Sequence, residues 1–508
     1  MKKIPLLQRR RSGVLMPIFS LPSPYGIGTF GKAAYDFVDF LKKAGQSYWQ
    51  ILPLGPTTFG DSPYQAYSTF AGNPYFIDLE TLCEEGYLTK EECDAIDFGS
   101  DPDDIDYSKI YQGRLALMKK AQKRFFANVP DDYEEFCKKN AYWLKDYAIF
   151  MAIKYENDGA SFHKWEEGLR LRKRADMMKA ALRLKKEIAL WKMQQYFFFK
   201  QWTALKKYAN DGGISIIGDL PIYVACDSAD VWASPDQFVL DENCKPTLVA
   251  GCPPDAFTAN GQLWGNPLYN WEKMKEDGYS WWCRRMKAAS TLYDVVRLDH
   301  FRGFEAYYTI PAGRKTARRG KWQKGPGMEL FRTFKKRIGD IPIIAEDLGF
   351  LTPAVHKMLQ ESGYPGMKVA QFAFGDPDYE SEYLPHTYPR NCVAYAGTHD
   401  NETIVGWLKN ADKITAKQAT AYFRLTKEEG ASWGVIRSMM ASPANTVIFQ
   451  IQDFIGLGNE ARINEPSTLG KNWRWRIRPE CINDWLAGLI LKSTALYFRL
   501  PEKTKEET

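Results

Sequence analysis

The sequence has little of what disulfide scaffolds, metal sites and membrane spans require. Its nine cysteines are scattered without any CxxC pair, and only five histidines occur in 508 residues. This pattern fits neither a disulfide framework nor a zinc site, so we expect reduced thiols in a cytoplasmic protein that binds no metal. No run of 18 apolar residues occurs, and the basic N-terminus lacks the apolar segment of a secretion signal. We therefore expect no membrane partner.

An excess of charge of one sign is also lacking. The net charge is +6, from 68 basic and 62 acidic residues, and the one local concentration of basic residues spans 314–324. A nucleic-acid-binding protein would carry a concentrated basic face, so we expect no nucleic acid as a partner. Residues 170–208 are rich in Arg and Lys as well, but the solvated surface of a helix explains them better.

A glycine motif near the N-terminus suggests a nucleotide site, which we reject. Gly26, Gly28 and Gly31 have the GxGxxG spacing of dinucleotide sites and follow a short apolar stretch. The next predicted strand, residues 48–54, ends in Leu-Gly-Pro and lacks the acid that would bind the ribose. No dinucleotide cofactor is therefore expected.

Eight short apolar segments alternate with helical patterns or loops and are predicted to be buried strands. They span residues 13–20, 48–54, 215–220, 294–299, 341–346, 367–374, 392–398 and 446–452. This alternation favours an α/β fold with a parallel (β/α)8 TIM barrel over a doubly wound sheet. We expect one catalytic unit over residues 1–508, with an inserted, mainly helical subdomain at 81–210. Residues 225–290 are predicted to be an irregular insertion with long loops over the active site.

Four acidic residues stand at or just past the end of a predicted strand: Asp219, Asp299, Glu346 and Asp400. In (β/α)8 barrels the carboxyl ends of the strands carry the chemistry, and strand capping alone poorly explains four such positions. Arg297 and Asp299 alternate onto one side of their strand. The guanidinium is expected to hold the Asp299 carboxylate ionised, as a nucleophile requires.

The sequence around Glu346 and Asp400 suggests roles for these two acids as well. The apolar residues before Glu346 predict a half-buried carboxyl with a raised pKa. A Glu of raised pKa facing an ionised Asp is the acid and nucleophile pair of retaining glycoside chemistry. His399 and Asp400 could form a metal pair, but no further His or Cys cluster supports it, so we interpret both as ligands of sugar hydroxyls.

Three motifs carry a specific resemblance. VRLDHFRGF (296–304), IIAEDLG (343–349) and GTHDNET (397–403) resemble the signature blocks of the α-amylase clan. Within that clan the chain is similar to the 4-α-glucanotransferases, called amylomaltase or disproportionating enzyme, over about residues 13–476. The blocks that carry this second resemblance are DSPYQAYSTFAGNPY (61–75), GCPPDAFTANGQLWGNPLYNW (251–271), GKWQKGPG (320–327) and NWRWR (472–476).

The resemblance implies transfer of α-1,4-glucan segments from a donor maltooligosaccharide to the 4-hydroxyl of an acceptor glucan or glucose, without a metal or organic cofactor. It implies that Asp299 is the nucleophile, Glu346 the general acid/base and Asp400 the transition-state stabiliser. The positions that match substrate-binding residues of the family are Tyr64, Asp219, Asp255, Trp264, Arg297, His399 and Asn472. Cys252 departs from the aliphatic residue that the family leads us to expect.

Two other functions remain open at this point. An α-amylase-type hydrolase of the same clan would carry the same three carboxylates, so only the flanking blocks favour transfer. A non-catalytic glucan-binding protein would bind without turnover, and the complete set of acids argues against it. The sequence carries no sign of an oligomeric state.

Overall fold

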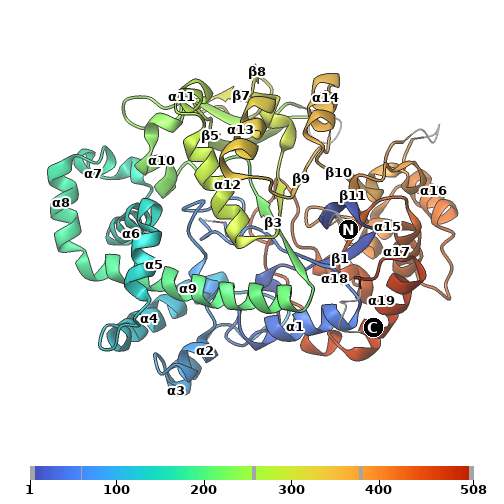
Figure 1. Ribbon diagram of the computed structural model, residues 1–508, viewed down its shortest axis with the longest axis horizontal. Coiled ribbons are helices and arrows are strands. Elements are labelled where there is room, and N and C mark those ends of the chain that lie inside the picture. The colour runs from blue at the N-terminus through green and yellow to red at the C-terminus, as the bar shows by residue number, and fades with distance from the viewer. Residues whose placement is uncertain (1–5, 59, 255–258, 350, 377–380, 503–508) are drawn as a thin grey trace.

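The computed structural model describes residues 6–58, 60–254, 259–349, 351–376 and 381–502. Its centre is a parallel sheet of eight strands in the order β10-β11-β12-β1-β2-β3-β6-β9 (Figure 1). The sheet closes because the amide of Ala345 donates to the carbonyl of Pro365 at 2.9 Å. The strands thus follow one another around a TIM barrel in chain order. Their bounds are β1 Arg11–Leu15, β2 Tyr48–Gln50, β3 Ser215–Leu220, β6 Val295–Leu298, β9 Ile343–Ala345, β10 Gly366–Val369, β11 Cys392–Tyr395 and β12 Thr446–Gln450.

All eight predicted strands are present, but several end earlier than predicted. Strand β10 ends at Val369, and residues 370–373 form a short 3-10 helix. Strand β12 ends at Gln450, where helix α18 (Ile451–Ile455) begins. A continuous apolar run looks the same in a buried strand and in a buried helix, so the pattern alone could not place these boundaries.

The barrel interior is apolar in its lower part and charged at its mouth. Residues Ile217 of β3 and Val295 of β6 belong to the same buried apolar cluster inside the barrel. Two positions further along these strands, on the same side, stand Asp219 and Arg297, which are paired in register. The charges therefore begin where the barrel opens at the carboxyl ends of its strands.

Amphipathic helices cover the outside of the barrel. Helix α1 buries Phe37 and Leu41 and ends at Gly45, whose φ of 65° is left-handed, as helix ends favour. The ring of Phe37 lies 5.1 Å from that of Trp49 in β2. The bounds of α1 and of the helices of seven or more residues that follow β3 are α1 Lys32–Lys43, α12 Ser280–Leu292, α13 Met328–Ile338, α14 Pro353–Ser362, α15 Ile404–Asn410, α16 Lys413–Phe423, α17 Ala431–Ala441 and α19 Asp484–Leu496.

Residues 79–211, between β2 and β3, are mainly helical and lie to one side of the barrel (Figure 1). The long amphipathic pattern over 170–208 is divided at Leu184 into α8 and α9. Phe198 and Trp202 of α9 contact Phe30, which joins this layer to the barrel. The bounds are α2 Leu79–Glu84, α3 Lys90–Asp94, α4 Tyr107–Phe125, α5 Tyr133–Lys139, α6 Ala141–Glu156, α7 Glu167–Arg170, α8 Arg174–Arg183 and α9 Lys185–Asp211.

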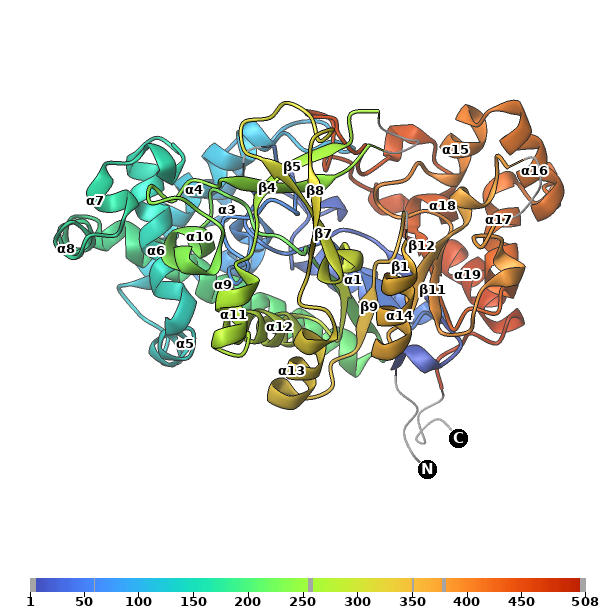
Figure 2. The same ribbon diagram turned by 90° about the horizontal axis from the view of Figure 1, so that it is seen from above.

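A small antiparallel sheet in the order β5-β4-β7-β8 lies to one side of the barrel strands in Figure 2. Two of its strands fall within 225–290, which also contains α10, α11 and most of α12, so this segment is more regular than predicted. The bounds are β4 Leu248–Cys252, β5 Gln262–Pro267, β7 Ala306–Pro311, β8 Lys321–Lys324, α10 Ala229–Ala233 and α11 Trp271–Glu276.

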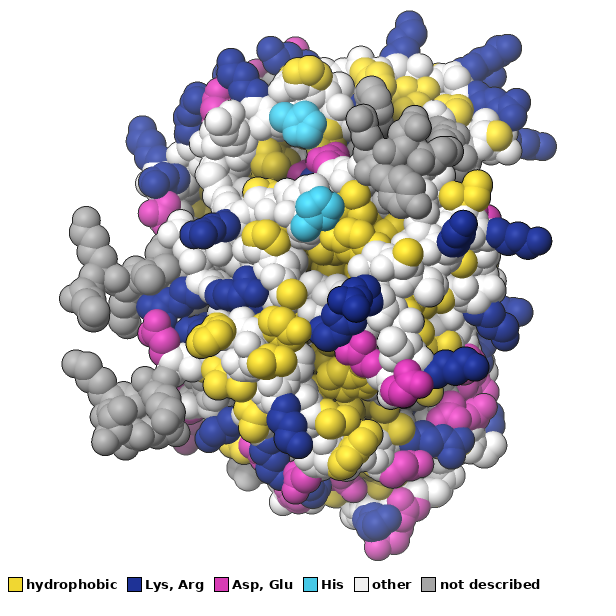
Figure 3. Space-filling model, turned by 90° about the vertical axis from the view of Figure 1, so that its right-hand side faces the viewer, with side chains coloured by type: hydrophobic (Ala, Val, Ile, Leu, Met, Phe, Trp, Pro, Cys, Tyr) yellow, Lys and Arg dark blue, Asp and Glu magenta, His cyan; other side chains and the backbone are white. Residues whose placement is uncertain are grey.

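The surface has no strongly basic face in the view of Figure 3, where Lys and Arg side chains are spread out and acidic side chains lie among them. This agrees with the small net charge of +6. In the described part of the chain, no helix is both long and apolar enough to cross a membrane.

Candidate active site

A cavity of about 1370 Å³ lies at the carboxyl ends of the barrel strands. All three predicted catalytic carboxylates border it: Asp299 after β6, Glu346 after β9 and Asp400 in the loop after β11. Of the predicted substrate-binding residues, Tyr64, Trp264 and Arg297 border it as well. Residues that are up to 336 positions apart in the sequence, from Tyr64 to Asp400, thus meet in one place. The predicted residue Asp255 lies outside the described residues.

Arg297 links two carboxylates. Its Nη1 donates to both oxygens of Asp219, at 2.8 and 2.6 Å, and to Oδ1 of Asp299 at 3.1 Å. The guanidinium is buried, so these charge-assisted bonds act with little screening by water. Arg297 therefore fixes the Asp299 carboxylate relative to the barrel.

The protonation of Asp299 is set by opposing effects. Burial raises the pKa of Asp299, and the carboxylates of Asp219, Glu346 and Asp400 add to this, whereas the Arg297 guanidinium lowers it; the net direction is upward. The expected lowering of the Asp299 pKa by the Arg297 guanidinium is therefore outweighed, because the sequence did not reveal how many carboxyl groups converge there.

Glu346 is held by backbone amides. The N–H of His300 donates to its Oε2 at 2.7 Å, and the N–H of Leu348 donates to its Oε1 at 2.8 Å. Burial nevertheless raises the pKa of Glu346, although Arg297 and these amides oppose it. The predicted direction of this shift is confirmed. His300 has a φ of 51°, a left-handed conformation that turns the chain after Asp299 and directs its N–H toward Glu346.

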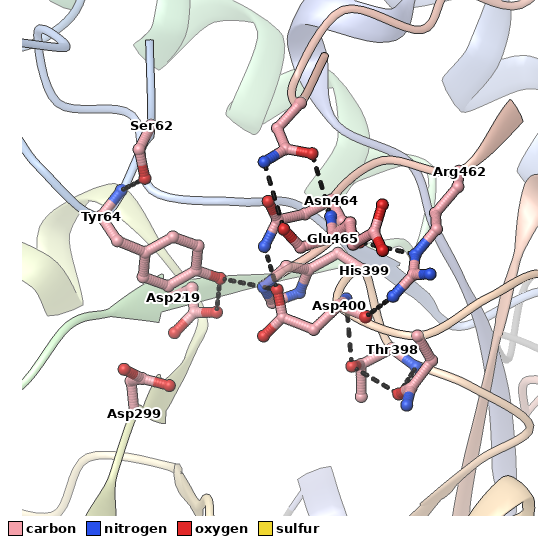
Figure 4. A network of polar contacts seen from close by, with 12 residues as sticks. Ser62, Tyr64, Asp219, Asp299, Thr398, His399, Asp400, Arg462, Asn464 and Glu465 are labelled. Atoms are coloured by element: carbon pink, nitrogen blue, oxygen red, sulfur yellow. Dashed lines mark hydrogen bonds and ion pairs between the residues drawn. The ribbon is translucent and has the colours of Figure 1, made fainter. Parts of the chain in front are cut away.

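Tyr64 joins two predicted ligands, Asp219 and His399 (Figure 4). Its hydroxyl donates to Asp219 Oδ2 at 2.8 Å and lies 2.8 Å from His399 Nε2. The Tyr64 and His399 rings are stacked with centroids 5.2 Å apart. Burial lowers the pKa of His399, which keeps the imidazole neutral near pH 7. Asp219 and His399 thus orient Tyr64, which itself borders the cavity.

Asp400 is positioned by a loop that the sequence pattern did not single out (Figure 4). The side-chain amide of Asn464 donates to Asp400 Oδ1 at 2.6 Å, and the guanidinium of Arg462 donates to the Asp400 carbonyl at 2.9 Å. His399 Nε2 lies 3.3 Å from the same carboxylate oxygen. Neither Asn464 nor Arg462 belongs to a motif with a recognisable period, so only the tertiary structure brings them to Asp400.

Trp264 is held beside His300, the residue that follows Asp299. Its ring meets that of His300 edge to face, with centroids 4.9 Å apart, and its indole N–H donates to Gln262 Oε1 at 3.0 Å. Both contacts fix the orientation of a side chain that borders the cavity. A flat apolar face in that position suits a sugar ring.

Asn472 has a different place from the one expected. Its side chain accepts a hydrogen bond from the Glu465 amide at 3.0 Å and donates to the Thr468 carbonyl at 3.0 Å, so it braces an exposed loop. Among the described residues that line the cavity, its neighbour Trp473 is present and Asn472 is not. The motif identified the correct segment, but Trp473 and not Asn472 borders the cavity, and the course of the backbone decides this.

A metal centre has no support in the described part of the chain, where no three His, Cys, Asp or Glu side chains are placed to hold an ion. His399 and Asp400 instead bond to Tyr64 and Asn464.

Comparisons with known proteins show the family of this chain. A family model described as 4-alpha-glucanotransferase, glycoside hydrolase family 77, matches residues 16–482. A 4-alpha-glucanotransferase of Clostridium butyricum is 50% identical over 486 residues, which cover 95% of this chain and all of the relative. One of Thermus thermophilus is 45% identical over 92% of this chain and 95% of its own length.

A solved structure is similar to this chain over nearly its whole length. The amylomaltase of Streptococcus agalactiae, in complex with acarbose, superposes with a TM-score of 0.95 at 42% identity and covers 97% of this chain and all of its own. Likeness of sequence and likeness of fold thus extend over nearly all of the 508 residues. The protein therefore belongs to the 4-alpha-glucanotransferases of glycoside hydrolase family 77, and its activity is on α-1,4-glucans.

Proposed function

We propose that the enzyme moves glucan segments from a donor maltooligosaccharide to the 4-hydroxyl of an acceptor glucan or glucose by retaining double displacement. The observation that carries the proposal is a pair of carboxyls on the neighbouring strands β6 and β9 with unlike surroundings. Asp299 is beside the Arg297 guanidinium, whereas Glu346 is held by backbone amides. Two carboxyls in different environments can divide the roles of nucleophile and acid.

In the first displacement, an oxygen of Asp299 attacks the anomeric carbon while the bond from that carbon to the glycosidic oxygen breaks. Glu346 gives its proton to the departing oxygen, so the reducing-end fragment leaves as an alcohol and a glucosyl ester remains on Asp299. The upward direction of the Glu346 pKa shift supports this role, because a general acid must hold its proton until the bond breaks.

In the second displacement, the 4-hydroxyl of the acceptor attacks the same carbon and the ester bond breaks. Glu346, now a carboxylate, takes the proton of that hydroxyl. Each displacement inverts the carbon once, so the configuration is retained and the number of glycosidic bonds is unchanged. No step draws on a cofactor.

The remaining polar residues hold the sugar that reacts. Asp400 stabilises the positively charged transition state and grips sugar hydroxyls, as Asn464 holds its carboxylate in place. Asp219 and His399 orient Tyr64 through its hydroxyl, so that its ring can contact the sugar. The role of Asp255 stays a prediction.

Transfer prevails over hydrolysis when the acceptor is held and water is excluded. Tyr64, Trp264 and Trp473 border the cavity with flat faces that suit an acceptor glucan. The acarbose complex of the Streptococcus agalactiae amylomaltase supports maltooligosaccharides as occupants of this cavity.

The division of the chain is part of the proposal. We regard residues 81–210 and 225–290 as insertions within one catalytic barrel. Strands β2 and β3 pair directly although the first insertion separates them, and so do β3 and β6 across the second.

Incubation with maltotriose alone tests the function. The expected result is release of glucose together with a ladder of longer maltooligosaccharides, while the number of reducing ends stays almost constant. A hydrolase would raise the reducing ends in step with glucose, and a glucan-binding protein would give no products. Either of these two results would overturn the proposal.

A further inference from the structure

Three of the large hydrophobic side chains that remain exposed lie at the cavity. Leu263, Trp322 and Phe372 border it, and each is 39–40% exposed. Single exposed apolar residues are ordinary, but a group of them at the mouth of a cavity is typical of a ligand site. Trp322 has the largest flat face of the three.

The Trp322 ring is held in place before any ligand binds. It stands on β8, the edge strand of the small sheet, directly opposite Tyr308 of β7. The Arg302 guanidinium lies 4.0 Å from its ring centroid, a cation–π contact. The Tyr308 ring is 5.2 Å away at 61°, and its hydroxyl is tied to the Ala317 carbonyl at 3.0 Å. A surface fixed in this way loses little entropy when a sugar stacks on it.

The position of Glu346 gives the direction of the bound chain. The acid protonates the oxygen of the leaving group, and the acceptor later occupies the same place, so both lie on the Glu346 side of Asp299. His300, whose amide bonds Glu346, contacts Trp264, and Arg302 follows two positions later. Arg302 and Trp322 therefore continue the acceptor side of the cavity.

Trp264 and Trp322 are too far apart to share one sugar ring. They stand on β5 and β8, the two edge strands of a four-stranded sheet, and both border the cavity. Three strand spacings separate these edge strands, so their backbones are about 14 Å apart. A glucan that contacts both tryptophans must therefore place different glucose units on them.

We infer that Trp322, held by Arg302, is a stacking platform for a glucose unit of the acceptor glucan beyond the unit at Trp264. This inference rests on the proposed function and adds a preference for long acceptors. A short acceptor such as glucose ends before it reaches Trp322, whereas a maltohexaose extends over it. The platform thus acts on the choice of acceptor and not on the bond that is broken.

The test uses α-maltosyl fluoride as the donor, because its fluoride leaving group occupies no sugar position on the acceptor side. Transfer to isotopically labelled glucose and to labelled maltohexaose is measured as labelled product. In W322A the ratio of kcat/KM for maltohexaose to that for glucose should fall about tenfold, equivalent to about 1.4 kcal/mol. W322F, which keeps a flat ring, should retain most of the ratio.

The matched control is W485A, because Trp485 is 72% exposed on α19 and does not line the cavity among the described residues. Its ratio should equal that of the parent. An unchanged ratio in W322A, or equal losses on both acceptors, would overturn the inference. If W322A fails to fold, W322F and W322L decide by the same ratio, which leucine should lower and phenylalanine should keep. Parent protein that transfers only to water would instead overturn the proposed function.

Discussion

Two aspartates near the ends of barrel strands have different surroundings. Asp299 follows β6 and borders the large cavity, where three other carboxyls and Arg297 surround it. Asp453 lies in α18, just after β12, and is fully buried. Its Oδ1 accepts the Ile404 amide at 2.8 Å, and no described residue forms an ion pair with it. Burial raises the pKa of both groups.

The comparison shows which surroundings distinguish Asp299, the proposed nucleophile, from a structural carboxyl such as Asp453. A strand end and a raised pKa are common to both residues, so neither property alone marks a catalytic acid. Asp299 has in addition a cavity that admits substrate, a guanidinium that orients it and a second carboxyl on the neighbouring strand. Asp453 has none of these among the described residues, and we interpret it as a neutral structural carboxyl.

The largest effect should come from removing the nucleophile. D299N keeps the size of the side chain but cannot form the ester, so turnover of maltotriose should fall by at least about 10³-fold. D453N is the matched control and should keep activity within about twofold of the parent. Turnover of D299N within about tenfold of the parent, in protein free of wild-type carry-over, would remove Asp299 from this role.

The loss of activity when Glu346 is replaced should depend on the leaving group of the donor. E346Q cannot protonate a sugar oxygen, so transfer from maltotriose should fall by about 10²–10⁴-fold. The first displacement with a glycosyl fluoride, measured as a burst of fluoride, should suffer much less because fluoride needs little protonation. Equal losses on the two donors would show that Glu346 is not the acid.

A smaller effect should follow when Asp400 loses its support. N464A removes the 2.6 Å bond to the Asp400 carboxylate and should lower kcat about tenfold, in the range of a hydrogen bond to a charged group. N472A alters a neighbouring loop without touching the cavity and should cost less than about threefold. The opposite order of the two variants would favour Asn472 as the substrate ligand that the family resemblance implied.

The smallest effect on activity, but a clear one on stability, is expected at Asp453. Its pKa is raised from 3.8 to about 7, so the folded state prefers the protonated form. The stability it contributes is complete below pH 3.8 and is lost as the pH rises to about 7. D453N cannot ionise, so relative to the parent it should gain about 2 kcal/mol between pH 5 and pH 8. Thermal unfolding at both pH values measures this gain, and an equal difference in Tm at the two values would contradict the assignment.

The sequence predicted most of the architecture because the barrel repeats a local pattern. Each apolar strand segment is followed by a helix or loop, and the acids at residues 219, 299 and 346 stand at strand ends in the structure as well. The predicted strands extended past the ends of β10 and β12, because an apolar run does not distinguish a strand from a buried helix. The strands β4 and β5 within 225–290 were not predicted, because β4 pairs with β7, which is distant in sequence, and no local pattern shows that pairing.

The site was predictable in part for the same reason. Side-chain alternation placed Arg297 and Asp299 together, and they do form an ion pair. No local pattern links Asn464 to Asp400, His300 to Glu346, or Trp322 to Arg302, because each contact joins segments whose separation is set by the closed barrel.

The sequence by itself determined the order of strands, the three carboxylates at their ends and the family to which the chain belongs, since these follow from local periodicity and contiguous motifs. Only the tertiary structure decided the direction in which the pKa of Asp299 is shifted and which aromatic rings face the cavity. The physical reason is that desolvation and Coulomb interactions depend on distances between side chains from different strands, and those distances exist only once the barrel has closed.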